Sequence, residues 1–216
     1  MSLPTRSTTP VADQLRSALL RGDYAPGQRL VEAELCESLG VGRAALREAI
    51  RLLAGDGLIE IEPHRTARVR KVSKDQALQM AEVRSVVEVL LARRAASRAT
   101  PADAAELVDI GRMMRDAVEA FDPMLYSELN ERLHTRIAEI ADHQVAAEVV
   151  NRLQVQLTRF QMRLSLKPGR PVATLVDHEK LIEAVASGDP DAAGEAMRTH
   201  LEEVVEALGS ADDLDR

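Results

Sequence analysis

The sequence predicts a mainly α-helical protein with two domains, a small N-terminal domain that includes a two-stranded hairpin and a larger helical bundle. Aromatic residues make up 2% of the 216 residues and there is no Trp, which suits helix packing better than a β-sandwich. Apolar residues recur at helical spacing between breaks rich in Gly and Pro. The net charge of -7 is uneven: residues up to Val72 carry 11 basic and 9 acidic side chains (+2), whereas residues from Ser73 on carry 17 and 26 (-9).

Cysteine content and hydropathy indicate a protein of the reducing cytoplasm. The one cysteine, Cys36, excludes an intramolecular disulfide and a cysteine-based zinc cluster. No apolar run approaches the length that spans a bilayer, and the first residues lack a signal-peptide pattern. We therefore expect a cytoplasmic protein without a membrane partner. Residues 1–9 are expected to form a flexible arm and residues 210–216 a disordered acidic tail.

The N-terminal domain is expected at residues 10–72. Helical spacing predicts a first helix over 10–21, a short second helix over 31–40 that ends at a glycine, and a third helix over 41–57. Alternating residues over 58–72, interrupted by a turn, predict a two-stranded hairpin. Three helices followed by a hairpin is the order of a winged helix-turn-helix domain.

The second domain is expected at residues 73–209 as a single all-helical bundle. Thr100-Pro101, Asp122-Pro123 and Asp189-Pro190 each combine an N-cap residue with proline at the first helical position. With the other capping signals they predict six helices, at about 75–99, 101–120, 123–141, 144–166, 174–187 and 190–208. The stretch "SLKPGRPVAT", residues 165–174, is predicted to be a loop.

The third helix of the first domain carries arginines that suit the major groove of double-stranded DNA. Arg43 and Arg47 stand four residues apart, so both can lie on one exposed face near the start of that helix. An arginine fork can bond guanine O6 and N7 or clamp a phosphate, and Arg51 extends the same face toward the DNA backbone. A lone arginine here would more simply belong to a solvated helix face. The order of the elements and the clustering of arginines favour DNA binding.

The hairpin tip "PHRTAR" predicts a second DNA contact. It places His64, Arg65 and Arg68 where a wing could lie along phosphates or enter the minor groove. Between Arg43 and Lys71 there are seven basic and four acidic residues, so a polyanion would bind there despite the acidic whole.

The stretch "LRSALLRGDYAPGQRLVEAELCESLGVGRAALREAIRLLAGDGLIEI" resembles the N-terminal domain of the GntR family of bacterial transcription regulators. The resemblance covers nearly the whole first domain. It implies that Arg43 and Arg47 are the recognition-helix arginines and that the wing follows at residues 64–68. Two residues depart from the family pattern: Gly42 stands where Ser or Thr is usual, and Thr66 stands near the usual wing glycine. The first departure would remove a phosphate-contacting hydroxyl, and the second would alter the wing tip.

Three histidines and one asparagine in the second domain have the chemistry of a metal site. Asn130 and His134 lie one helical turn apart in "YSELNERLHTRI", His178 opens "HEKLIEAVASGD", and His200 lies in "AMRTHLEEVVEAL". Imidazole nitrogens with an amide oxygen suit borderline divalent metals. A single histidine on an apolar face is more often a satisfied core residue, and sequence spacing does not show that three helices converge. From the residues alone, both interpretations stay open.

The stretch "HEKLIEAVASGDPDAAGEAMRTHL" resembles the C-terminal signature of the FadR subgroup of GntR regulators, whose effector domain is an all-helical bundle called FCD. The resemblance implies one divalent metal ion, zinc before nickel or manganese, held by His134, His178 and His200 with Asn130 in place of the usual aspartate. Six helices rather than seven indicate the VanR-like branch. Because asparagine is neutral, a bound dication would keep a net charge near +2 and attract an anionic effector.

Arg84, in "EVRSVVEVLLARRAA", matches an arginine of the same family and is the candidate effector-binding residue. A carboxylate could bridge the metal and Arg84. A salt bridge from Arg84 to Glu88, one turn on, is the alternative. The subgroup also implies a homodimer, which suits a palindromic operator.

These patterns predict a metal-dependent, small-molecule-responsive DNA-binding transcription regulator, expected to be a repressor that a small organic or sugar acid releases from its operator. One alternative is a regulator with a metal-free cavity in which the histidines bind the ligand directly. The other is a helical metalloenzyme. It is disfavoured because the sequence places no carboxylate or serine beside the histidines as a base or nucleophile, so no catalytic residue is predicted.

Overall fold

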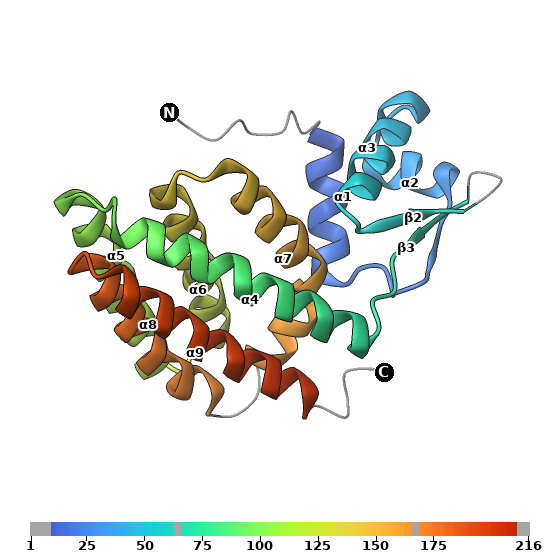
Figure 1. Ribbon diagram of the computed structural model, residues 1–216. Helices are drawn as coiled ribbons and strands as arrows, with labels where there is room; N and C mark the ends of the chain where they lie inside the picture. Colours follow the sequence, from blue (N-terminus) through green and yellow to red (C-terminus); the bar gives the residue numbers. More distant parts are fainter. Residues whose placement is uncertain (1–9, 63–65, 166–168, 211–216) are drawn as a thin grey trace. The chain divides into compact units, whose positions relative to one another are not determined.

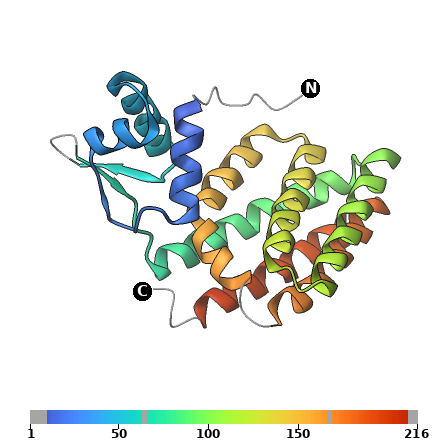
Figure 2. The same cartoon turned by 180° about the vertical axis from the view of Figure 1, so that it is seen from behind.

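The computed structural model describes residues 10–62, 66–165 and 169–210 (Figures 1 and 2). The chain divides into two compact units after Ser73. The described residues form nine helices and one three-stranded sheet, so the predicted mainly α-helical fold is confirmed. The predicted arm and residues 211–216 of the predicted tail lie outside the described residues. None of the described helices combines the length and apolar content that crossing a bilayer requires.

The first unit has three helices and a small antiparallel sheet of strand order β1-β3-β2, in which Ile59 pairs with Val69 and Leu30 with Ala67. Strand β1 was not predicted, because two residues are too few to show an alternating pattern. The elements are α1 (Pro10–Arg21), β1 (Arg29–Leu30), α2 (Glu32–Leu39), α3 (Arg43–Gly55), β2 (Ile59–Ile61) and β3 (Ala67–Val69).

The turn between α2 and α3 positions the recognition helix. Gly40 adopts φ 65° and ψ 34°, a left-handed conformation that glycine enters without a steric penalty. The N–H of Val41 then donates to the carbonyl of Cys36 at 3.0 Å, which closes the end of α2. Helix α3 buries Leu46, Leu53 and two neighbouring apolar residues, so its opposite face is left to solvent.

The second unit consists of the six predicted helices. Thr100 and Asp103 form a reciprocal capping box at the start of the second helix, and Asp122 and Asp189 cap two others, each followed by proline. The helices are α4 (Lys74–Ala96), α5 (Pro101–Glu119), α6 (Pro123–Ala141), α7 (Gln144–Ser165), α8 (Arg170–Ala186) and α9 (Pro190–Gly209).

One predicted boundary was wrong. Helix α8 begins at Arg170, so the second half of the predicted loop is helical. Gly169 precedes the helix with φ 78°, and Pro171 occupies its first turn, where the fixed φ of proline favours a helix start and its missing N–H costs nothing.

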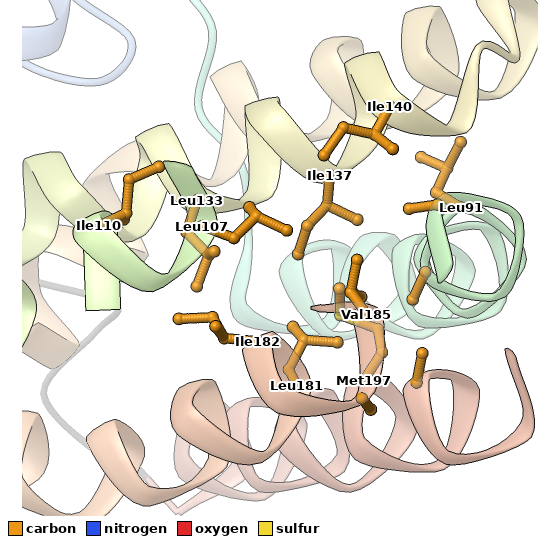
Figure 3. Close-up of a cluster of buried hydrophobic side chains, with 14 of the residues drawn as sticks. Leu91, Leu107, Ile110, Leu133, Ile137, Ile140, Leu181, Ile182, Val185 and Met197 are labelled. Carbon is orange, nitrogen blue, oxygen red and sulfur yellow. The ribbon is translucent and has the colours of Figure 1, made fainter. Parts of the chain in front are cut away.

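Apolar side chains from all six of these helices form the core of the second unit, part of which Figure 3 shows. Leu107 of α5, Leu133 of α6 and Leu181 of α8 have no accessible surface. Helices α4 and α9 run side by side in both ribbon views and are antiparallel, since Arg93 pairs with Asp191 while Gly209 lies beside Leu78 (Figures 1 and 2). The described residues that are polar and buried all belong to this unit: Arg84, Glu88, His134, Thr174, Asp177, His178 and His200.

Candidate functional site

Three histidines converge inside the second unit. His134 of α6, His178 of α8 and His200 of α9 are all buried, and each offers one ring nitrogen within 4.8 Å of the others. The rings of His178 and His200 have centroids 4.3 Å apart. The structure therefore brings together the three predicted histidines from three separate helices. We call this cluster the three-histidine centre.

A buried carboxylate fixes the tautomer of His134. Its Nδ1 bonds Glu88 Oε2, and the other oxygen of Glu88 bonds Arg84 Nε. Burial by itself would raise the pKa of Glu88, but the charge of Arg84 and the hydrogen bonds from Arg84 and His134 lower it to about 2. Because an ionised carboxylate can only accept, a neutral His134 donates its Nδ1–H. Its Nε2 is then left with a lone pair that faces the other two rings.

A chain of hydrogen bonds between uncharged groups fixes the tautomer of His178. The hydroxyl of Thr174 donates to the carbonyl of Arg170 at 3.1 Å, so the Tyr126 hydroxyl must donate to Thr174 Oγ1 at 2.8 Å. Burial raises the pKa of Tyr126 to about 12, which keeps this phenol protonated. His178 Nδ1, 2.9 Å from the Tyr126 oxygen, is then the donor of the last bond. Its Nε2 therefore also carries a free lone pair.

The ring nitrogens that point into the three-histidine centre have no partner among the described residues. They are His134 Nε2, His178 Nε2 and His200 Nδ1, all buried. Burial lowers the pKa of His178 to about 3 and the pKa of His200 well below its usual value, so both rings stay neutral. Buried unpaired polar atoms are costly and call for a bound group. Three neutral imidazole lone pairs fit a divalent metal with coordination positions left for other ligands.

A cavity of about 170 Å³ adjoins the three-histidine centre, with walls from α4, α6, α7, α8 and α9. Water in bulk takes about 30 Å³ per molecule, so this volume suits a small ligand. Asn130 lines the cavity together with His178 and His200, is half-buried, and its side chain has no hydrogen bond among the described residues.

Among the described residues, two arginines line this cavity, and they differ in their pairing. Arg84, the predicted effector-binding residue, is buried and forms a salt bridge with Glu88, one helical turn on. This is the alternative that the sequence also suggested. Arg170 was missed by the sequence reading. It is half-buried and donates from Nη2 to the carbonyl of Glu203 at 3.3 Å.

Sequence reasoning also missed the residues that orient the histidines. Glu88 was considered only as a partner of Arg84, and Tyr126 and Thr174 were not considered. A signal was present, because Thr174 precedes His178 by one helical turn, as Glu88 follows Arg84. Such spacing is common on helices, so it identifies these residues only once the histidines are known to converge.

The exposed face of α3 carries the three predicted arginines. Arg43 begins the helix and has no ion pair among the described residues. Arg47 Nε contacts both carboxylate oxygens of Glu32, each at 3.0 Å, and this pair is partly exposed. Arg51 pairs with Glu48 at 3.3 Å. The arginine face is therefore in place before any DNA is bound.

The wing is only partly described. Arg68 lies on β3 rather than at the tip, with Nε 2.9 Å from Glu62 and Nη1 3.3 Å from the carbonyl of Gly27. His64 and Arg65 lie outside the described residues.

A helix-turn-helix unit with an exposed arginine face, joined to a helical unit with a small polar cavity, defines a DNA-binding regulator that senses a ligand. Residues 8–69 match the family described as bacterial regulatory proteins, gntR family, and residues 79–203 match the FCD domain. The chain belongs to the GntR family of bacterial transcription regulators and carries an FCD domain.

The similar proteins are regulators. The chain is 32% identical over 205 residues to the HTH-type transcriptional repressor RspR of Escherichia coli (strain K12), covering 93% of this chain and 90% of that one. It is 26% identical to a probable D-xylose utilization operon transcriptional repressor of Paenarthrobacter nicotinovorans, covering 89% and 86%. The solved structure of E. coli McbR/YncC shares the fold with a TM-score of 0.78 at 22% identity, covering 92% and 95%. The first two are named as transcriptional repressors, so the family places this chain with transcription regulators and not with metalloenzymes.

Proposed function

We propose that this regulator is a metal-dependent repressor that a small organic acid releases from its operator. The observation that carries the proposal is the set of three buried ring nitrogens, from α6, α8 and α9, that face one another without a partner among the described residues. Two of the similar proteins are named as repressors, which supports the sign of regulation.

The metal would be held by His134, His178 and His200, with the Asn130 carbonyl oxygen as a fourth ligand. Zinc suits such a set, and nickel and manganese are alternatives. A bound metal would act as a Lewis acid toward a carboxylate. The charges of Arg84 and Glu88 offset each other, and the three rings are neutral, so the centre would keep the +2 charge of the ion. An anion is therefore the ligand that it would attract.

DNA contacts are proposed for the face of α3 and for the wing. Arg43 and Arg47 would contact bases, and Arg51 would contact the backbone. Glu32 holds the Arg47 guanidinium in place on the free protein, so this side chain is ordered in advance. His64, Arg65 and Arg68 would contact phosphates or the minor groove.

A second copy of the chain is proposed to cover one apolar face of the second unit. Val83, Val86 and Leu90 of α4 are 52%, 74% and 42% exposed and share one side of that helix. Exposed Val145 and Val149 lie on α7, whose start adjoins the end of α4, since Arg94 Nε donates to the Ala141 carbonyl at 3.1 Å. A two-fold pairing of these faces would match a palindromic operator.

The metal content of the purified protein tests the three-histidine centre. We expect about one zinc ion per chain in the wild type and almost none in His178→Ala, because the variant removes one of three nitrogen donors. His143→Ala should bind as much as the wild type, since His143 only caps α7 through the N–H of Ala146. Elemental analysis after dialysis measures this. Equal zinc in His178→Ala and wild type would refute the centre.

Operator binding tests the arginine face. Replacing Arg43 by alanine should weaken specific binding by about 5- to 150-fold, the range for losing one bidentate base contact. Arg112→Ala, an exposed arginine of α5, serves as the control and should change nothing. Fluorescence anisotropy with upstream DNA and with unrelated DNA gives the ratio of specific to non-specific affinity. If Arg43→Ala weakens both DNAs equally, the residue contacts phosphate and not bases.

Sedimentation tests the proposed dimer face. Val86→Glu should shift the chain from dimer to monomer, because it would bury two unpaired carboxylates at a two-fold contact. Val108→Glu on α5, where the side chain is 54% exposed, should stay dimeric. A dimeric Val86→Glu, or a monomeric wild type, contradicts the assignment.

Effector release tests the function as a whole. Millimolar organic acids should lower the operator affinity of the metal-loaded wild type and leave that of His178→Ala unchanged, because the acid would bind at the metal. Removal of zinc by a chelator should abolish the response. A response that persists after zinc removal would favour the metal-free cavity instead, and no response to any acid would refute the proposal.

A further inference from the structure

The two arginines of the cavity are not equally available to an anion. Arg84 is buried and its charge is balanced by Glu88, which itself is shared with His134. Arg170 has no ion pair among the described residues, and its one hydrogen bond there goes to a backbone carbonyl. Burial and the neighbouring Asp177 raise the pKa of the nearby Glu203 carboxyl and the charge of Arg170 opposes that shift, but no ion pair joins Glu203 to Arg170 among the described residues. Of these two arginines, Arg170 is therefore the one whose guanidinium is not held by a carboxylate.

Arg170 is also fixed in position relative to the three-histidine centre. It is the first residue of α8, and its carbonyl accepts the Thr174 hydroxyl that begins the chain to Tyr126 and His178. It lines the same cavity as His178 and His200. The arginine and the centre thus present two separate cationic points to one small cavity once a metal is bound.

We infer that Arg170 binds a second acid group of the effector, so that the effector is a short dicarboxylate with one end at the three-histidine centre and the other at Arg170. This inference rests on the proposed function, since it assumes that an acid binds at the centre. An arginine fork binds a carboxylate with two parallel hydrogen bonds, which gives direction as well as charge. The cavity of about 170 Å³ has room for a short dicarboxylate.

The other polar residues of the cavity are compatible with a dianion. Ser127 and Asn130 are neutral and have no side-chain hydrogen bond among the described residues, so both can bond carboxylate oxygens or a hydroxyl between them. Glu128 and Glu131 also line the cavity, but both are exposed, where water and salt screen their repulsion.

Matched acids on the full-length, zinc-loaded protein test the inference. Succinate and butyrate have the same four-carbon chain and differ by one carboxylate, and isothermal titration gives their affinities. The wild type should bind succinate at least about tenfold more tightly, as expected for one charge-assisted bidentate contact. Arg170→Gln should remove this preference and leave butyrate binding unchanged, and Arg170→Lys should restore part of it. Arg198→Gln, outside the cavity on α9, is the control.

The outcomes separate this inference from the proposed function. Zinc content and the unliganded Tm of Arg170→Gln should match those of the wild type, which shows that the variant is folded and keeps its centre. In the contrary case, the wild type binds succinate no more tightly than butyrate, and binds each diacid of three to six carbons no more tightly than the monoacid of the same length. That result would overturn the role of Arg170 but keep an acid-responsive regulator. An equal loss of both acids in Arg170→Gln would also overturn it. If no mono- or diacid binds the wild type, the proposed function fails as well.

Discussion

The buried carboxylate of Glu88 is the interaction on which the second unit depends. It neutralises a buried arginine of α4 and at the same time accepts the Nδ1–H of His134, so it joins α4 to α6 through a charge-assisted hydrogen bond. Removing one member of such a buried group leaves an uncompensated charge, which typically costs about 3–5 kcal/mol. The same carboxylate directs the free nitrogen of His134 inward. Glu88 thus contributes both to the stability of the second unit and to the chemistry of the three-histidine centre.

The centre is held by two different kinds of support. A charged contact orients His134, and a neutral chain through Tyr126 and Thr174 orients His178. Partners of this type fix the tautomer and the ring plane of metal-binding histidines. Because both are buried, the ring nitrogens already face one another without a ligand, so little reordering is needed when a group binds between them.

Local signals in the sequence predicted most of the fold, and tertiary contacts account for what was missed. The capping residues Thr100, Asp122 and Asp189 marked helix starts because their bonds lie within one turn. Strand β1 depends on pairing with β3, 38 residues on, and gives no local pattern. The histidines could be proposed only from a family resemblance, since convergence of α6, α8 and α9 is a property of packing. Arg170 was missed because it lay in a stretch read as loop.

The packing of α5 against α8 connects this polar centre to an apolar contact one helical turn further along the same face of α8. Gly111 of α5 leaves room for Ile182, whose Cδ1 would lie 2.8 Å from any Cβ at position 111. Ile182 follows His178 by one helical turn on α8. A single methyl group at residue 111 would force the isoleucine to change rotamer or α8 to move, and a displaced α8 carries His178 with it. Gly111 touches no ligand, yet the substitutions it tolerates are limited because the ring of His178 must keep its orientation.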